Sequence, residues 1–238
     1  MSNLIEYVKN ILLPPRCVIC DRVIAPAESP LCPRCAKMSL PYILGEACKS
    51  CGREKTRCRC KYGKSISDGI AATFYYEQPI KGAIGLYKRI EDNHRTVFFT
   101  KEMLKMALER YGDKQVDYIT AVPMRRRDKL ARGFDQVIPL ARALSRAVYV
   151  PYVPLLKKLF DTPPQKSLRG ELRKGNVLGA FDVKTKVSLK GKTILLIDDV
   201  VTSGATTDEC AKMLKIYGAA RVYVLTLAVT KPKERQEQ

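Results

Sequence analysis

Eight cysteines in four closely spaced pairs constrain the first quarter of this 238-residue chain more than any other feature. A gap of two residues lets a tight turn present two thiolates to one metal ion, and two such turns complete a tetrahedral zinc site. Eight thiolates therefore predict two zinc sites. The simplest assignment follows the order in the chain: Cys17, Cys20, Cys32 and Cys35 for the first site, and Cys48, Cys51, Cys58 and Cys60 for the second.

Three alternatives compete with this assignment. Interleaved pairs are compatible with the same spacings. Disulfides are disfavoured because the sequence shows no secretory signal, and an iron–sulfur cluster is disfavoured because four evenly spread pairs look like two ribbons. The last pair, Cys58 and Cys60, is the weakest because one residue separates its members; its site could be less well formed or empty. Four thiolates leave no position open to substrate, so both zinc ions are expected to be structural.

The first 15 residues predict a short amphipathic helix that ends at Pro14 and Pro15. Glu6 and Lys9 interrupt its apolar residues, and no small-residue cleavage site follows, which is unlike a signal peptide. The sequence also lacks an apolar run of the roughly 18 residues needed to span a bilayer. A cytoplasmic protein that does not insert into membranes is therefore expected.

The formal net charge of +19 favours an anionic partner: nucleic acid, a phosphorylated small molecule or an acidic protein. A merely solvated basic surface is the alternative. Residues 67–238 carry 31 of the 43 Lys and Arg residues and 19 of the 24 Asp and Glu residues. Metal-bound thiolates would further reduce the positive charge of residues 1–66. The basic excess is therefore mainly a property of the second part of the chain.

After residue 66 the pattern changes to apolar strands alternating with helices. Strands are expected at 69–77, 116–124, 192–201 and 221–229, with helices from residue 80 and at 95–111, 135–148 and 206–217, and a basic loop at 125–133. This alternation predicts an α/β domain with a parallel sheet, whose ligands bind beyond the carboxyl ends of the strands. Two domains are expected, covering residues 1–66 and 67–238.

Asp198 and Asp199 stand at the end of the most apolar of these strands, directly before a loop of small residues. The loop offers backbone amides, hydroxyl groups and the positive end of a helix dipole, which together suit a phosphate. The two carboxylates would repel a phosphate but can accept hydrogen bonds from ribose hydroxyls. The stretch therefore predicts a ribose 5-phosphate site, whose phosphate-binding residues are Thr202, Ser203, Gly204, Ala205 and Thr206.

Residues 194–206 resemble the 5-phosphoribosyl-1-pyrophosphate signature of type I phosphoribosyltransferases. The stretch 121–136, AVPMRRRDKLARGFDQ, and the stretch 162–181, TPPQKSLRGELRKGNVLGAF, are similar to segments of the ComF family, with Asp135 in place of the usual Asn. With the cysteine pairs, the resemblance covers nearly the whole chain. It implies a small cysteine-rich double zinc ribbon followed by a type I phosphoribosyltransferase-like parallel sheet with flanking helices.

The resemblance also implies roles for other residues. The loop after the strand 116–124 would bind pyrophosphate, Mg²⁺ would arrive with that ligand, and residues 160–176 would form a lid. The expected reaction displaces pyrophosphate at the anomeric carbon by a nitrogen nucleophile, and no general base stands out. The candidate pyrophosphate-binding residues are Val122, Pro123, Met124, Arg125 and Arg132.

Three functions remain open at this point. The first is a phosphoribosyltransferase with an unidentified acceptor, in which Asp198 and Asp199 serve catalysis. The second is a non-catalytic protein that binds single-stranded DNA during natural transformation. The third is an adaptor whose zinc head docks competence partners. The resemblance implies a competence helicase and a DNA-loading protein as such partners. Aromatic stacking platforms for DNA are not evident from the spacing.

Overall fold

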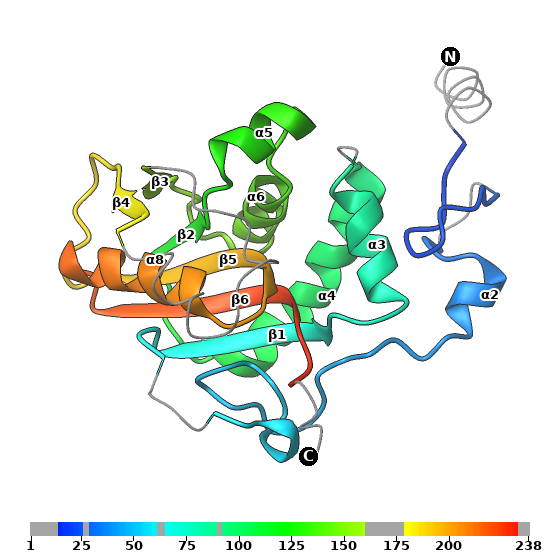
Figure 1. The fold of residues 1–238 in the computed structure, drawn as a ribbon, viewed down its shortest axis with the longest axis horizontal. Coiled ribbons are helices and arrows are strands. Elements are labelled where there is room, and N and C mark those ends of the chain that lie inside the picture. The colour runs from blue at the N-terminus through cyan, green and yellow to red at the C-terminus, as the bar shows by residue number, and fades with distance from the viewer. Residues whose placement is uncertain (1–13, 26–28, 61–64, 90–91, 160–178, 233–238) are drawn as a thin grey trace, which may run out of the picture.

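A computed structural model describes the chain except for residues 1–13, 26–28, 61–64, 90–91, 160–178 and 233–238. The expected N-terminal helix and the expected lid therefore lie outside the described residues. Four parallel strands form the central sheet in the order β1–β6–β5–β2 (Figure 1). Their bounds are Gly69–Tyr75 for β1, Tyr118–Ala121 for β2, Thr193–Val201 for β5 and Arg221–Val229 for β6. The expected parallel α/β sheet is confirmed.

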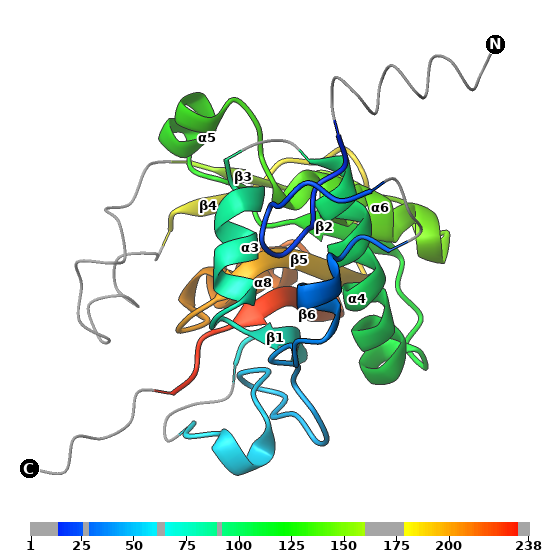
Figure 2. The same cartoon turned by 90° about the vertical axis from the view of Figure 1, so that its right-hand side faces the viewer.

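Helices cover both faces of this sheet. Figure 2 shows α3, α4 and α6 in front of the strands and α8 behind them. Alternate side chains of β5 serve the two layers: Leu195 and Ile197 pack in the core on the α4 side, whereas Ile194 and Leu196 pack with the fully buried Cys210 of α8. The bounds are Ile80–Tyr87 for α3, Asn93–Tyr111 for α4, Val137–Val148 for α6 and Ala205–Ile216 for α8.

Two features differ from the expectation. The basic stretch after β2 is a helix, α5 (Arg126–Arg132), and not a loop. Asp128 in its first turn pairs with Arg125, and Gly133 ends it with φ of +80°. A two-stranded antiparallel sheet, β3 (Leu156–Lys158) with β4 (Phe181–Val183), was also not expected. Strands of three residues are too short to produce a recognisable alternation.

The first cysteine cluster (Cys17, Cys20, Cys32 and Cys35) packs against the helices of the sheet. Its members Cys17 and Cys35 share one apolar core with residues of α4. Arg95 of α4 is only 5% exposed and donates to the carbonyl of Val18 at 3.0 Å and to the Asp21 carboxylate at 2.7 Å. Arg95 also pairs with Asp92 at the start of its own helix. A buried arginine thus ties the cluster to the sheet.

Replacing Arg95 by alanine is expected to lower the free energy of unfolding by about 3 kcal/mol, because breaking a buried ion pair leaves its partners unsatisfied. Urea unfolding of the zinc-loaded protein measures this change. The matched control is Arg146→Ala, which removes an exposed arginine from α6. A loss for Arg95→Ala no larger than the loss for Arg146→Ala would contradict the anchoring role.

Within the described ranges, no helix has both the length and the apolar character needed to cross a membrane.

Candidate functional site

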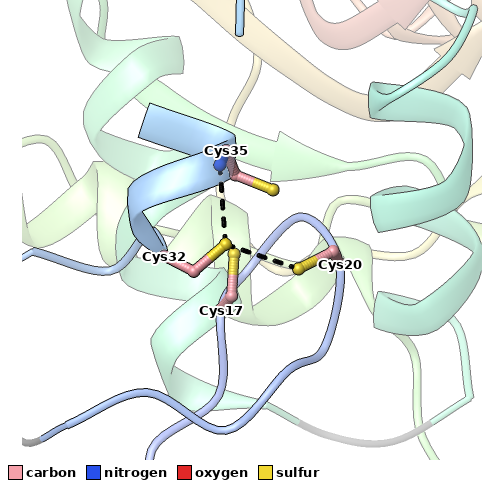
Figure 3. Close-up of side chains that lie close together, drawn as sticks. All are labelled: Cys17, Cys20, Cys32 and Cys35. Atoms are coloured by element: carbon pink, nitrogen blue, oxygen red, sulfur yellow. Dashed lines mark hydrogen bonds between the residues drawn. The ribbon is translucent and has the colours of Figure 1, made fainter. Parts of the chain in front are cut away.

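The eight paired cysteines form two groups of four, as their order in the chain predicts. In each group the sulfur atoms all lie within 4.8 Å of one another. Figure 3 shows the first cluster, with Cys17 and Cys20 on one loop and Cys32 and Cys35 at the start of the short helix α2 (Pro33–Ala36). Interleaved pairing is therefore wrong. Four thiols gathered without disulfides fit a tetrahedral Zn²⁺ ion.

The second cysteine cluster (Cys48, Cys51, Cys58 and Cys60) is complete but more open. Cys51 is buried, whereas Cys60 is exposed. The amide of Cys60 donates to the sulfur of Cys58 at 3.4 Å. Although only one residue separates these two cysteines, both of their sulfurs lie with those of Cys48 and Cys51. The short 3-10 helix η1 (Lys55–Arg57) leads into Cys58. The closest-spaced pair thus supplies two ligand atoms like the other pairs.

The thiols of the first cluster have different surroundings. The amide of Cys35 donates to the sulfur of Cys32 and lowers the pKa of that thiol to about 7. Burial raises the pKa of Cys35, because a charged thiolate loses solvation there. A bound divalent cation would hold all four groups as thiolates, so that metal binding releases protons and strengthens as the pH rises.

A second constellation lies at the carboxyl ends of β2 and β5. Ala121, the last residue of β2, pairs with Ile197 across the two parallel strands, so the segment that begins with Val122 leaves the sheet beside Asp198, while β5 continues along β6 to Val201. The predicted pyrophosphate loop (residues 122–125) and phosphate loop (residues 202–206) therefore share one edge. This is the edge at which open parallel sheets bind ligands.

The phosphate loop surrounds a small hollow of about 120 Å³, lined by Asp198 and residues 200–207. Gly204 has φ of +81°, which lets the loop turn into α8. Among the described residues, the amides of Ser203 and Gly204 have no hydrogen-bond acceptor, and the amide of Ala205 reaches only the hydroxyl of Ser203 at 3.4 Å. These donors stand at the N-terminus of a twelve-residue helix, where an anion is favoured.

The two aspartates have different surroundings, because adjacent residues on a strand point to opposite faces. Asp198 lines the hollow, and its carboxylate accepts from the amide of Asp199. Burial, together with the charge of Asp199, raises the pKa of Asp198 well above its usual range. Asp199 faces the opposite layer, where Lys88 contacts its Oδ2 at 2.7 Å.

Sequence reasoning missed two partners of Asp199. Lys88 follows the end of α3, and the Gln136 side chain donates to Oδ2 of Asp199 at 2.6 Å. Burial alone would raise the pKa of Asp199, but the charge and hydrogen bond of Lys88 and the hydrogen bond of Gln136 outweigh burial and lower it. Gln136 is the last residue of the RGFDQ stretch, and this position is the only feature of the sequence that indicated a role for it. No feature of the sequence indicated Lys88, because only the fold brings it to β5.

The remaining candidate residues surround this centre. Arg132 donates to the side-chain oxygen of Gln136 at 3.1 Å, so it reaches Asp199 indirectly. Arg125 pairs with Asp128 at 2.7 Å. The buried Asp135 accepts from the amide of Met124 at 3.3 Å, which ties the pyrophosphate loop to the start of α6, and burial raises the pKa of Asp135. Val122 is buried, whereas Pro123 is partly exposed.

Opposite effects on stability are expected from Asp198→Asn and Asp199→Asn. An acid whose pKa is raised in the folded state lowers the stability of the protein as the pH rises above the pKa that the acid has in the unfolded chain. Removing this acid by Asp198→Asn should therefore stabilise the protein at pH 7 by about 1 kcal/mol. An acid with a lowered pKa gives stability that is lost only as the pH falls through the folded pKa. Asp199→Asn breaks the Lys88 pair and should therefore cost about 2 kcal/mol at pH 7.

Thermal and urea unfolding at pH 5 and pH 7 measure both changes. The stabilising effect of Asp198→Asn should shrink at the lower pH. Equal effects of the two substitutions would contradict the separation of the two carboxylates by the strand.

Comparison with known proteins identifies a domain family in each part of the chain. The double zinc ribbon domain family matches residues 8–66, and the phosphoribosyl transferase domain family matches residues 136–238. Competence protein ComFC of Streptococcus pneumoniae is 32% identical, covering 89% of this chain and 86% of that protein. Competence protein F of Haemophilus influenzae is 26% identical, covering 90% and 96%. The DNA utilization protein YhgH of Escherichia coli O6:H1 is 28% identical, covering 90% of both chains.

The relatives extend over both the cysteine clusters and the sheet domain, and the first of them is matched over most of its own length. The comparison therefore finds a double zinc ribbon and a phosphoribosyl transferase domain in one chain. The chain therefore belongs to the ComF family, with a double zinc ribbon and a phosphoribosyltransferase-type domain.

Proposed function

We propose that this protein binds 5-phosphoribosyl-1-pyrophosphate with Mg²⁺ at the carboxyl ends of β2 and β5. The observation that carries this proposal is the phosphate loop: the amides of Ser203 and Gly204 have no acceptor among the described residues, and the loop lines a hollow together with Asp198. In this arrangement the 5-phosphate accepts from the amides of Ser203 and Gly204. The ribose hydroxyls donate to the carboxylates of Asp198 and Asp199.

The pyrophosphate group is proposed to lie against residues 122–125, with Arg125 and Arg132 supplying positive charge. Lys88 pairs with Asp199, and its charge helps to keep the pKa of that carboxyl low. Mg²⁺ is expected to be held by ligand oxygens and water more than by protein side chains. Such a site suits transfer of the ribosyl group: the anomeric C–O bond breaks, pyrophosphate leaves and a nitrogen nucleophile forms the new bond.

Calorimetric titration of the zinc-loaded protein with 5-phosphoribosyl-1-pyrophosphate and Mg²⁺ tests the proposal. Saturable binding of one ligand per chain is expected, with competition by ribose 5-phosphate and by inorganic pyrophosphate. A folded wild-type protein that binds none of the three would overturn it. If 5-phosphoribosyl-1-pyrophosphate binds, a screen of nitrogen nucleophiles follows, because turnover with an acceptor is what would show that the site is catalytic.

We also propose a role in handling DNA during competence, which the names of the relatives support. The excess of basic residues in residues 67–238 fits contact with single-stranded DNA, and the zinc head offers a surface for competence partners. Binding of single-stranded DNA through these residues should weaken steeply as salt rises. An affinity that does not change with salt would argue against this second role and leave the sugar-phosphate site as the only one.

A further inference from the structure

Arg53 joins the second cysteine cluster to the phosphate loop. It follows the turn that carries Cys48 and Cys51, and its carbonyl accepts from the amide of Cys48 at 2.7 Å. The backbone of Arg53 is therefore part of the turn that would hold the metal. Its side chain leaves this turn and is partly buried against a distant part of the chain.

The guanidinium of Arg53 contacts two backbone carbonyls beyond the ends of β5 and β6. Nε donates to the carbonyl of Thr230 at 2.6 Å, and an Nη atom donates to the carbonyl of Thr202 at 3.0 Å. Thr202 is the first residue of the phosphate loop. The hydroxyl of Thr230 lies near the same two groups, 3.3 Å from Arg53 and 3.4 Å from the Thr202 carbonyl. An arginine fork can hold two oxygens in a fixed orientation, which lysine cannot do.

The turn itself is fixed on the sheet. The amide of Ile70 donates to the carbonyl of Lys49 at 2.8 Å, and a Cβ placed on Gly52 would lie 3.0 Å from a methyl group of Ile70. The turn therefore packs against the edge strand β1, and it lies below that strand in Figure 1. Arg53 thus reaches the loop from an anchored base.

The contact with Thr202 orients the donors of the phosphate loop. A peptide unit is planar and trans, so its carbonyl and its amide point in opposite directions. Fixing the Thr202 carbonyl on Arg53 directs the amide of Ser203 away from Arg53. Arg53 does not line the hollow, so it holds the loop from outside without contacting a ligand there.

We propose that the second cysteine cluster, when loaded with metal, sets the geometry of the phosphate loop through Arg53, which is a positioning residue for phosphate ligands. The identity of the ligand rests on the proposed function, whereas the link from the second cysteine cluster through Arg53 to the phosphate loop does not. Loss of the metal releases the turn, Arg53 leaves Thr202, and the Ser203 amide is no longer held ready for a phosphate. Metal loading would thereby control affinity at a site on another part of the chain.

The test combines hydrogen exchange with ligand titration on the full, zinc-loaded chain. Arg53→Ala should speed amide exchange in residues 202–206 and weaken ribose 5-phosphate binding about tenfold, as expected for two coupled sites. Zinc content should stay at the wild-type value. Arg53→Lys should restore little, because one ammonium cannot hold both carbonyls. Cys58→Ser with Cys60→Ser should give the same change in exchange when the first cluster remains loaded.

The control is Lys49→Ala, which removes an equal charge from an exposed position of the same turn. Unchanged exchange at residues 202–206 in Arg53→Ala would overturn the inference, whatever the ligand result. Faster exchange in a protein whose wild type binds no ribose 5-phosphate would support the link to the loop and would overturn the proposed ligand instead. A tenfold weaker affinity in Lys49→Ala as well would reduce the effect to charge alone and would also overturn it.

Discussion

Replacing both Asp198 and Asp199 by alanine should abolish binding of 5-phosphoribosyl-1-pyrophosphate, with affinity at least about 100-fold below that of the wild type. Each of the two carboxyl groups is proposed to accept a hydrogen bond from a ribose hydroxyl. Such a bond contributes roughly 0.5–1.5 kcal/mol, and roughly 1.5–3 kcal/mol when the acceptor is charged, as Asp199 is. The phosphate contacts remain in the double variant, but they cannot replace the binding free energy of the two lost hydrogen bonds. Calorimetry with the zinc-loaded protein and Mg²⁺ measures the loss directly.

The double variant needs a control that removes the same charge elsewhere. Glu109→Ala combined with Asp113→Ala removes two exposed carboxylates at the end of α4 and should leave the affinity unchanged. Affinity for single-stranded DNA should survive in both variants if basic residues carry it. Binding of the ligand by the Asp198 and Asp199 double variant within threefold of the wild type would remove the carboxylates from the site.

The two cysteine clusters are expected to differ in their effect on stability. Cys17→Ser with Cys35→Ser should leave the protein largely unfolded at 37 °C, because these two side chains are buried in the same core as α4. Arg95 donates to the backbone carbonyls of Cys17 and Val18, so loss of the fold around the first cluster would also leave this buried arginine without these acceptors. The expected loss approaches the roughly 5–15 kcal/mol that stabilises a folded domain.

Cys58→Ser with Cys60→Ser should cost far less, because Cys60 is exposed and Cys58 is only partly buried. Urea unfolding measures both losses, and metal analysis should find one zinc ion per chain in each variant that folds. Equal losses of stability in the two variants would show that the first cluster is no more a part of the core than the second.

Some conclusions followed from the sequence because they depend on local spacing. Two cysteines separated by one or two residues can bind one ion whatever the fold of the rest of the chain. The two clusters and their order along the chain were therefore predictable. A run of apolar residues that ends in Asp198, Asp199 and small residues likewise indicated a central parallel strand with a loop at its carboxyl end. The strand β6 was placed at its observed bounds, since a buried strand bounded by a glycine turn and a proline has clear limits.

Other features were out of reach because they depend on residues far apart in the chain. Lys88 lies more than a hundred positions from Asp199, and no local pattern links them. The same holds for Arg53 and Thr202, which are 149 positions apart. The sequence predicts a loop in place of the helix α5 because basic residues dominate this stretch and no side chain caps its start; only Asp128 in the first turn and Gly133 at the end indicate a helix.

The sequence by itself determined the grouping of the cysteines, the parallel sheet and the position of a loop of small residues after its central strand, since each is encoded in neighbouring residues. Only the tertiary structure decided how these parts act on one another. The strand pleat sends Asp198 and Asp199 to opposite faces, one toward the hollow and one toward Lys88. Packing of the cysteine turns on α4 and β1 brings Arg95 and Arg53 to their partners, because contacts between distant segments arise from the order of the strands and the shape of the core.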